Sequence, residues 1–189
     1  MLIWLLVILG VVALDQASKW LVILYLDKEE PFVLIDGVLQ LKYVENSGAA
    51  FGSFSDNRWV FIIISVIGIA AMLIYLWKFR PDSKWACAAL SMVIGGGLGN
   101  MVDRLFYVGT LPGKTDKNVV IDFIDFCAFP DLWKWGFNIA DSFVCVGAGI
   151  LIVWCICSVV AEAKAEKAKK ALEAQNTDGT DTGDSGKEE

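Results

Sequence analysis

Long apolar runs separated by polar stretches dominate the sequence and set its expected architecture. Four runs, residues 2–26, 59–77, 85–106 and 137–160, are each about as long as the roughly 20 residues that a helix needs to cross a bilayer core. The first run resembles a secretory signal in its position, but it lacks a basic start and a small-x-small cleavage site, so we expect a retained span. The pattern predicts an all-α membrane protein with four transmembrane helices.

The connections between the runs differ in length and charge, which predicts an orientation. Basic residues gather in the short second connection and after the fourth run: Lys78, Arg80 and Lys84, then Lys164, Lys167, Lys169 and Lys170. Positive residues flanking spans mark the cytoplasmic side. We therefore expect both termini inside the cell and the long connections, residues 27–58 and 107–136, outside.

The outer connections carry short patterns of their own. In the first, residues 32–35 and 38–44 predict two strands joined by a two-residue turn at Asp36 and Gly37, a small β-hairpin outside the membrane. The second has turn residues at Pro112 and Gly113, followed by aromatic side chains, which are typical of the headgroup level of a membrane. These rings are equally consistent with a simple interfacial anchor and with a substrate contact.

Three segments follow from these patterns. Residues 1–160 form the expected four-span membrane domain. Residues 161–176 are rich in Ala, Glu and Lys, with Glu166 and Lys170 one helical turn apart, and predict a cytoplasmic helical extension. Residues 177–189 are polar and acidic, so they are expected to form a disordered tail.

Composition narrows the chemistry that the chain can perform. The sequence has no histidine, which excludes Ser-His-Asp catalysis, Cys-His catalysis and histidine-bound zinc. None of its 5 cysteines forms a CxxC pair, so we expect no metal and no cofactor. The net charge of -6 arises largely from the tail, and no basic patch predicts nucleic-acid binding.

Polar residues concentrate in five places at or near the span ends, where ionisable groups are costly unless paired or functional. Asp15 and Lys19 are spaced for an ion pair within one helix, and this structural role is favoured over a substrate contact. Residues 46–52, beginning with Asn46 and containing Gly48, fit a ligand contact and a tight re-entrant turn equally well.

The other three places contribute acidic side chains. Asn100, Asp103 and Arg104 share one face at the end of the third run, after a glycine-rich stretch that allows close helix packing. Asp122 lies in the second outer connection, close to Asp125. The last place, at the start of the fourth run, has Asn138 as a candidate helix cap and Asp141 near the helix N-terminus.

The predicted topology brings Asp122, Asp141 and the Asn100/Asp103/Arg104 face to the same outer boundary. Two carboxylates close together in a poorly hydrated site share a proton, so one acts as an acid and the other as a base. Such a pair hydrolyses peptide bonds without histidine or metal. On the residues alone, a proton-relay or transport role for the same aspartates is an equal alternative, and a non-enzymatic assembly scaffold is a third.

Five motifs in this order resemble the bacterial lipoprotein signal peptidase family, also called signal peptidase II. They are DQxSK, NSGAAFG, GNMVDR, VIDF and FNIADS, and together they cover residues 11–149. Each motif is weak alone, whereas the ordered set at the span ends is specific. The resemblance implies an intramembrane aspartyl endopeptidase that removes signal peptides from diacylglyceryl-modified prolipoproteins, cutting before the lipidated cysteine.

The resemblance also implies roles for individual residues. The catalytic aspartates match Asp122 and Asp141, with Asp125 as the competing candidate for the first position. Matches to substrate-binding residues are Asn46, Gly48, Asn100, Asp103, Arg104 and Asn138, and matches to a structural polar cluster are Asp15 and Lys19. The implied partners are prolipoprotein substrates and membrane lipid. We expect a monomer in the bacterial inner membrane, with its active site near the outer face.

Overall fold

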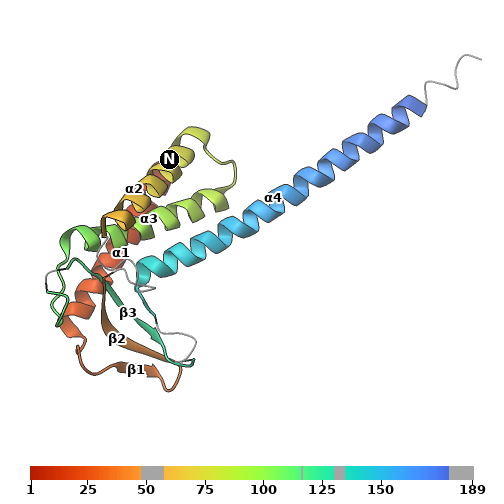
Figure 1. The fold of residues 1–189 in the computed structure, drawn as a ribbon. Coiled ribbons are helices and arrows are strands. Elements are labelled where there is room, and N and C mark those ends of the chain that lie inside the picture. Colours follow the sequence, from red (N-terminus) through yellow and green to blue (C-terminus); the bar gives the residue numbers. More distant parts are fainter. Residues whose placement is uncertain (48–57, 116, 130–134, 179–189) are drawn as a thin grey trace, which may run out of the picture. The chain divides into compact units, whose positions relative to one another are not determined.

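The structure is a computed structural model that describes residues 1–47, 58–115, 117–129 and 135–178. It divides into two compact units, Met1–Leu151 and Ile152–Glu189. In chain order the elements are α1 (Leu2–Tyr25), β1 (Phe32–Ile35), β2 (Leu39–Asn46), α2 (Arg58–Ile74), the π-helical turn η1 (Tyr75–Phe79), α3 (Lys84–Phe106), β3 (Val120–Phe126), β4 (Gly136–Phe137) and α4 (Ile139–Asp178) (Figure 1).

Four helical stretches among the described residues are long and apolar enough to cross a membrane. They are Leu2–Tyr25, Ile62–Phe79, Lys84–Phe106 and Ile139–Lys170. The predicted fold class, four membrane-spanning helices with a small β element, is therefore confirmed. The fourth helix begins at Ile139, two residues later than predicted, because Gly136 and Phe137 pair with β3 as an edge strand.

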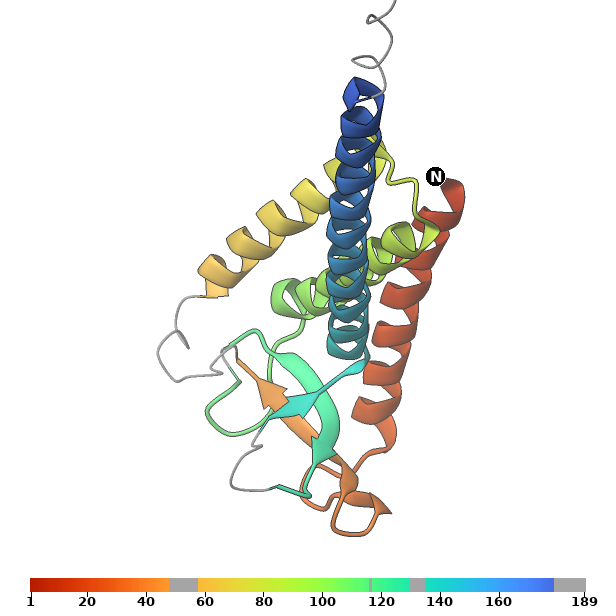
Figure 2. The ribbon, with the colours of Figure 1, turned by 90° about the vertical axis from the view of Figure 1, so that its right-hand side faces the viewer.

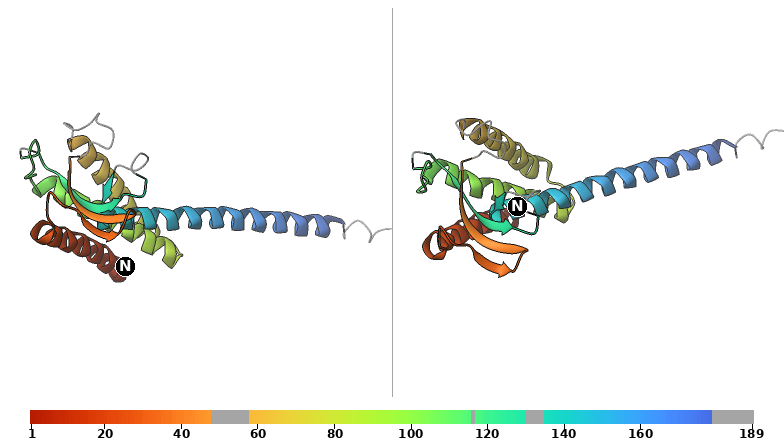
Figure 3. Two further views of the ribbon diagram at one scale, coloured as in Figure 1. Left: turned by 90° about the horizontal axis from the view of Figure 1, so that it is seen from below. Right: turned by 60° about the horizontal axis from the view of Figure 1, so that its bottom comes forward.

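The sheet is antiparallel, with the strand order β1-β2-β3-β4, so the β1–β2 hairpin lies at one edge (Figure 3). The predicted two-residue turn is wrong: Ile35 pairs with Leu39, which leaves a three-residue loop from Asp36 to Val38. A two-residue type I′ turn needs positive φ at both central residues. Within this loop only Gly37 has a positive φ, of 66°.

Helix α3 is the centre of the bundle, and α1 and α2 both pack against it (Figure 2). Its glycines allow this approach. A Cβ on Gly95 would lie 2.7 Å from the Cβ of Val11, and a Cβ on Gly99 would lie 2.6 Å from Oδ2 of Asp15. The glycine-rich stretch expected to allow close packing thus faces α1 at Gly95 and Gly99. The apolar core around Ile94, which is fully buried, joins residues from α1, α2, η1 and α3.

A second apolar cluster fastens the sheet to the helices. Val22 of α1 packs with Tyr43 of β2 and with Ile121 and Phe123 of β3. Val119, directly before β3, completes the buried set. This cluster holds β2 and β3 against the end of α1, so a side chain on the inner face of β3 is directed toward the helices.

The second unit begins within α4. Residues 152–178 continue the helix, and Glu166 and Lys170 form the expected exposed ion pair, with an N–O distance of 2.6 Å. Residues 161–176, the expected helical extension, lie within this helix. The tail was expected to be disordered from residue 177, but residues 177 and 178 still belong to α4, so the helix is two residues longer than predicted. The remainder of the expected tail, residues 179–189, lies outside the described residues.

Candidate active site

Asp122 is placed by the register of the sheet. It lies in the middle of β3, paired with Val44 of β2, and its side chain is only 2% exposed. Asn46, at the end of β2, donates from Nδ2 to Oδ2 of Asp122 at 2.9 Å. Gly136 of β4 lies beside it, where a Cβ would come within 3.2 Å of the Asp122 Cβ. The carboxylate is thus buried but held by an amide.

Asp141 is placed by the cap of α4. The Asp141 amide donates to Oδ1 of Asn138 at 2.9 Å, and the Asn138 amide donates back to Oδ2 of Asp141 at 3.3 Å. This reciprocal arrangement is a capping box with aspartate in the third helical position. The cap therefore fixes the carboxylate instead of competing with a chemical role for it.

Two side-chain amides bridge the carboxylates. Asn138 donates from Nδ2 to Oδ1 of Asp122 at 2.8 Å and to Oδ1 of Asn100 at 2.9 Å. Asn100 in turn donates from Nδ2 to Oδ1 of Asp141 at 2.7 Å. Asp122 of β3 and Asp141 of α4 are 19 residues apart in the sequence (141 − 122). Asn100 of α3 and Asn138 thereby join them in one hydrogen-bonded chain.

A buried lysine sets the orientation of the Asn100 amide. Lys19, which is 2% exposed, donates from Nζ to Oδ1 of Asn100 at 3.0 Å. The same nitrogen lies 2.8 Å from Oδ2 of Asp15 and 2.8 Å from Oδ2 of Asp103. An ammonium group has three protons, and these three acceptors use all of them. Because the Asn100 oxygen faces donors, its nitrogen must face Asp141.

Asp15 also ties α1 to the beginning of α4. Its Oδ2 pairs with Lys19, and its Oδ1 accepts a hydrogen bond from the amide of Ala140 at 2.9 Å. On the α3 side, a Cβ added to Gly96 would lie 2.4 Å from the Ala140 carbonyl oxygen. The absence of a side chain at Gly96 thus lets the first turn of α4 lie directly on α3.

The electrostatics of the site favour a shared proton. The pKa of Asp122 is raised to about 7, mainly by burial and also by the charge of Asp141, while the hydrogen bonds from Asn46 and Asn138 oppose the shift. Arg104 is close enough for its charge to interact with Asp141, Asp122 and Asp103. Its Nη1 donates to the Asn100 carbonyl oxygen at 3.4 Å.

The structure brings together most of the residues predicted for the site. Asp122, Asp141, Asn46, Asn100, Asp103, Arg104, Asn138, Asp15 and Lys19 form one connected polar cluster. Gly48 lies outside the described residues. Asp125, the alternative to Asp122, instead accepts a hydrogen bond from Gln40 at 2.7 Å on the neighbouring strand.

Two polar residues near the cluster, Gln16 and Glu45, were not singled out from the sequence; Gln16 is half-buried and Glu45 is buried. Gln16 donates from Nε2 to Oδ1 of Asp103 at 2.8 Å and to the Gly99 carbonyl at 3.1 Å. The sequence feature that could have identified Gln16 is its polar side chain next to Asp15 in an otherwise apolar span. It helps to hold Asp103 in position for Lys19.

The second missed residue is Glu45, which is 5% exposed. Burial alone would raise its pKa, but hydrogen bonds from the amides of Leu111 and Thr110, the Thr110 hydroxyl and the Tyr43 hydroxyl lower it below its usual value. Two-residue periodicity could have found Glu45, because it shares the buried face of β2 with Tyr43. Glu45 anchors the loop after α3 beside Asn46.

Known proteins resemble this chain in sequence and in fold. The sequence matches the family described as Signal peptidase (SPase) II over residues 7–157. This chain belongs to the signal peptidase II family. It is therefore a peptidase and a multi-pass bacterial membrane protein, and the predicted family is confirmed.

Several relatives of this chain within the signal peptidase II family are named lipoprotein signal peptidase. The protein from Halalkalibacterium halodurans is 35% identical over 152 residues, which cover 80% of this chain and 90% of the relative. The protein from Geobacillus kaustophilus is 37% identical, with coverages of 76% and 86%. The protein from Halothermothrix orenii is 38% identical, with coverages of 78% and 91%.

Solved structures support the same fold. Two structures described as a bacterial membrane enzyme, determined by the in meso method, resemble this chain. One has a TM-score of 0.71 at 27% identity and covers 84% of this chain and 90% of its own. The other has a TM-score of 0.70 at 28% identity, with coverages of 82% and 93%.

Proposed function

We propose that this chain is an intramembrane aspartyl endopeptidase that removes signal peptides from diacylglyceryl-modified prolipoproteins, cutting before the lipidated cysteine. One observation carries the proposal: Asp122 and Asp141 lie in one buried cluster and are bridged by the amides of Asn138 and Asn100. The family match and the names of the relatives support the substrate class.

The two carboxylates have different surroundings, which suggests different roles. Asp122 is buried in the sheet with a pKa raised to about 7, so it retains a proton near neutral pH and serves as the acid. Asp141 accepts hydrogen bonds from Asn100 and from the Asn138 backbone in the first turn of α4. Amide donors and the helix dipole both stabilise a negative charge there, so Asp141 serves as the base.

Hydrolysis then follows from one proton on the pair. The Asp141 carboxylate takes a proton from a water molecule while the water oxygen attacks the scissile carbonyl carbon, and Asp122 gives its proton to the carbonyl oxygen. The resulting tetrahedral gem-diol collapses as the C–N bond breaks. Asp141 returns its proton to the leaving nitrogen, and one gem-diol hydroxyl returns its proton to Asp122. The pair is then ready for another cycle.

The residues around the two aspartates bind the substrate and orient the catalytic carboxylates. Arg104 presents a guanidinium fork suited to a backbone carbonyl of the substrate, while Asn46 and Gly48 lie in the segment proposed to contact it. Asp103 forms an ion pair with Lys19 at 2.8 Å. Lys19 is a positioning residue: through Asn100 it determines which amide atom faces Asp141.

A lipid-anchored substrate explains the location of the site. The diacylglyceryl chains remain in the bilayer while the scissile bond reaches the carboxylates, so the membrane prepositions the reactant. By the charge distribution of the connections, both termini face the cytoplasm and the Asp pair lies near the outer face. We further propose that a monomer is sufficient, because both carboxylates come from one chain.

The test is to incubate the purified full chain with a prolipoprotein-derived peptide and with the same peptide lacking diacylglyceryl. Cleavage of the lipidated peptide before the modified cysteine, located by mass spectrometry, is the expected result. Cleavage at another position or equal turnover of the unlipidated peptide would overturn the substrate assignment. Absence of cleavage, together with flux of protons across proteoliposomes, would instead favour the transport role.

A further inference from the structure

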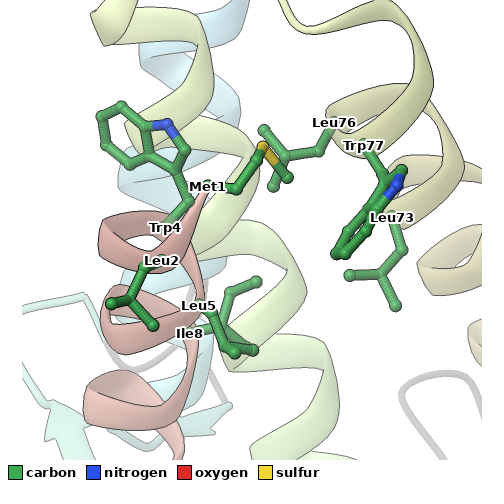
Figure 4. Close-up of a pocket in the computed structure, with 8 residues that line it drawn as sticks. All are labelled: Met1, Leu2, Trp4, Leu5, Ile8, Leu73, Leu76 and Trp77. Atoms are coloured by element: carbon green, nitrogen blue, oxygen red, sulfur yellow. The ribbon is translucent and has the colours of Figure 1, made fainter.

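An apolar pocket lies between the beginning of α1 and the end of α2, away from the candidate active site. Its volume is about 310 Å³. Trp4, Leu5 and Ile8 of α1 line one side, and Leu73, Leu76 and Trp77 of α2 and η1 line the other (Figure 4). The volume is at the lower end of the range of about 300–1,000 Å³ for small-molecule pockets.

The pocket follows from the packing of the bundle. α1 and α2 both pack on α3, which leaves a space between them. Its floor is buried, with Ile8 and Leu76 only 4% and 3% exposed, whereas Leu5 and Trp77 on its rim are 51% and 69% exposed. Both helices are membrane spans. The medium that meets this rim is therefore lipid, and every lining side chain is apolar apart from the indole nitrogens.

Positive charge lies at the same end of the bundle. The chain leaves the pocket at Trp77 and continues through Lys78, Arg80 and Lys84, which are exposed, with Asp82 as the one acidic residue between them. Lys78 lies over the Phe79 ring at 5.8 Å from the centroid. Basic groups beside a pocket between spans are suited to an anionic lipid headgroup.

We propose that this pocket binds one acyl chain of an anionic glycerophospholipid, with the phosphate of the same lipid held by Lys78, Arg80 and Lys84. The apolar lining selects a hydrocarbon chain, and the basic connection selects a negative headgroup. The bound chain fills the space between α1 and α2 and so stabilises their packing on α3. The site lies at the opposite end of α1 from Val22, which contacts the sheet.

The headgroup part is tested by native mass spectrometry of the full chain with palmitoyl-oleoyl phosphatidylglycerol and the matching phosphatidylcholine. Wild-type protein should retain phosphatidylglycerol preferentially. The triple variant K78Q/R80Q/K84Q should lose this preference, by roughly fivefold in affinity for each charge removed. The matched control is K164Q/K167Q/K169Q, which removes three charges from α4 and should retain it. Equal retention of both lipids by wild type, or an unchanged preference in the first triple variant, would overturn the proposal.

The acyl-chain part is tested with L73F, which fills the pocket, against I67F on the exposed face of the same helix. L73F should weaken binding of phosphatidylglycerol, and I67F should not. Dihexanoyl phosphatidylglycerol, with the same headgroup and short chains, should bind more weakly than the long-chain lipid. Equal binding of both lipids, or equal binding by L73F and I67F, would show that the pocket holds no chain. A lipid-free dimer that L73F disrupts would assign the pocket to a second copy instead.

Discussion

The raised pKa of Asp122 predicts a specific dependence of stability on pH. In the unfolded chain an aspartate has a pKa near 3.8, whereas in the folded protein Asp122 has a pKa of about 7. The folded state therefore binds a proton that the unfolded state has lost. Stability from this group is fully present below the unfolded pKa and is lost as pH rises through about 7.

The magnitude follows from the size of the shift. Between about pH 5 and about pH 7, this carboxyl group should reduce the unfolding free energy by about 1.4 kcal/mol per pH unit, and little further loss follows up to about pH 9. The total loss is about 3 kcal/mol. For a chain of this size the melting temperature should fall by roughly 6–12 °C. Asp122 is 2% exposed, so solvent screening does not reduce the effect.

The assay is thermal unfolding in detergent, followed by tryptophan fluorescence from about pH 5 to about pH 9. The difference in melting temperature between wild type and D122N isolates the group, because the other titrating residues are common to both. D122N should gain stability relative to wild type as pH rises, and D125N should follow wild type. A difference in melting temperature between wild type and D122N that does not change with pH would show that Asp122 does not have a raised pKa in the folded protein.

Three further substitutions test the supporting network. Lys19→Met leaves the buried carboxylates of Asp15 and Asp103 without their cation and should lower the unfolding free energy by about 3–5 kcal/mol. The protein that remains folded should have a reduced kcat. An unchanged melting temperature would contradict the buried ion pairs. Gly96→Ala should lower kcat by on the order of 100-fold, because the added Cβ would displace the first turn of α4. Gly149→Ala is the control and should leave kcat unchanged, because there is open space around Gly149. Equal activity of the two variants would count against the contact between Gly96 and α4. Glu45→Gln places an amide donor against backbone donors and should lower the unfolding free energy by about 1–3 kcal/mol, and an unchanged melting temperature would argue against the loop anchor.

Local sequence features were sufficient for the spans and for the pairing of Asp15 with Lys19. Helical spans depend on the length of an apolar run, and the pair depends on spacing within one helix, so both are visible without tertiary contacts. The cap of α4 by Asn138 was likewise predictable from sequence. In the structure the cap and the position of Asp141 are one arrangement, because the same two residues exchange both hydrogen bonds.

Other features depend on partners distant in sequence. β3 has no simple apolar-polar alternation, and its strand conformation is decided by pairing with β2, which was not predictable locally. The prediction of a two-residue hairpin turn was wrong because that turn needs a positive φ at Asp36. An aspartate can adopt a positive φ but does not have to, and Asp36 does not adopt one. The choice of Asp122 over Asp125 also needed the structure, since only register shows that Asp125 meets Gln40.

If Asp122 and Asp141 together activate water, kcat on the lipidated precursor should depend on both, and the decisive measurement is kcat for D122N, D141N and the matched control D125N. D122N and D141N should each lose at least about a thousandfold in kcat, within the range expected for a lost acid or base, while both still insert in the membrane. D125N should cleave at close to the wild-type rate. Full activity in D122N or in D141N, or a loss in D125N as large as theirs, would contradict the assignment.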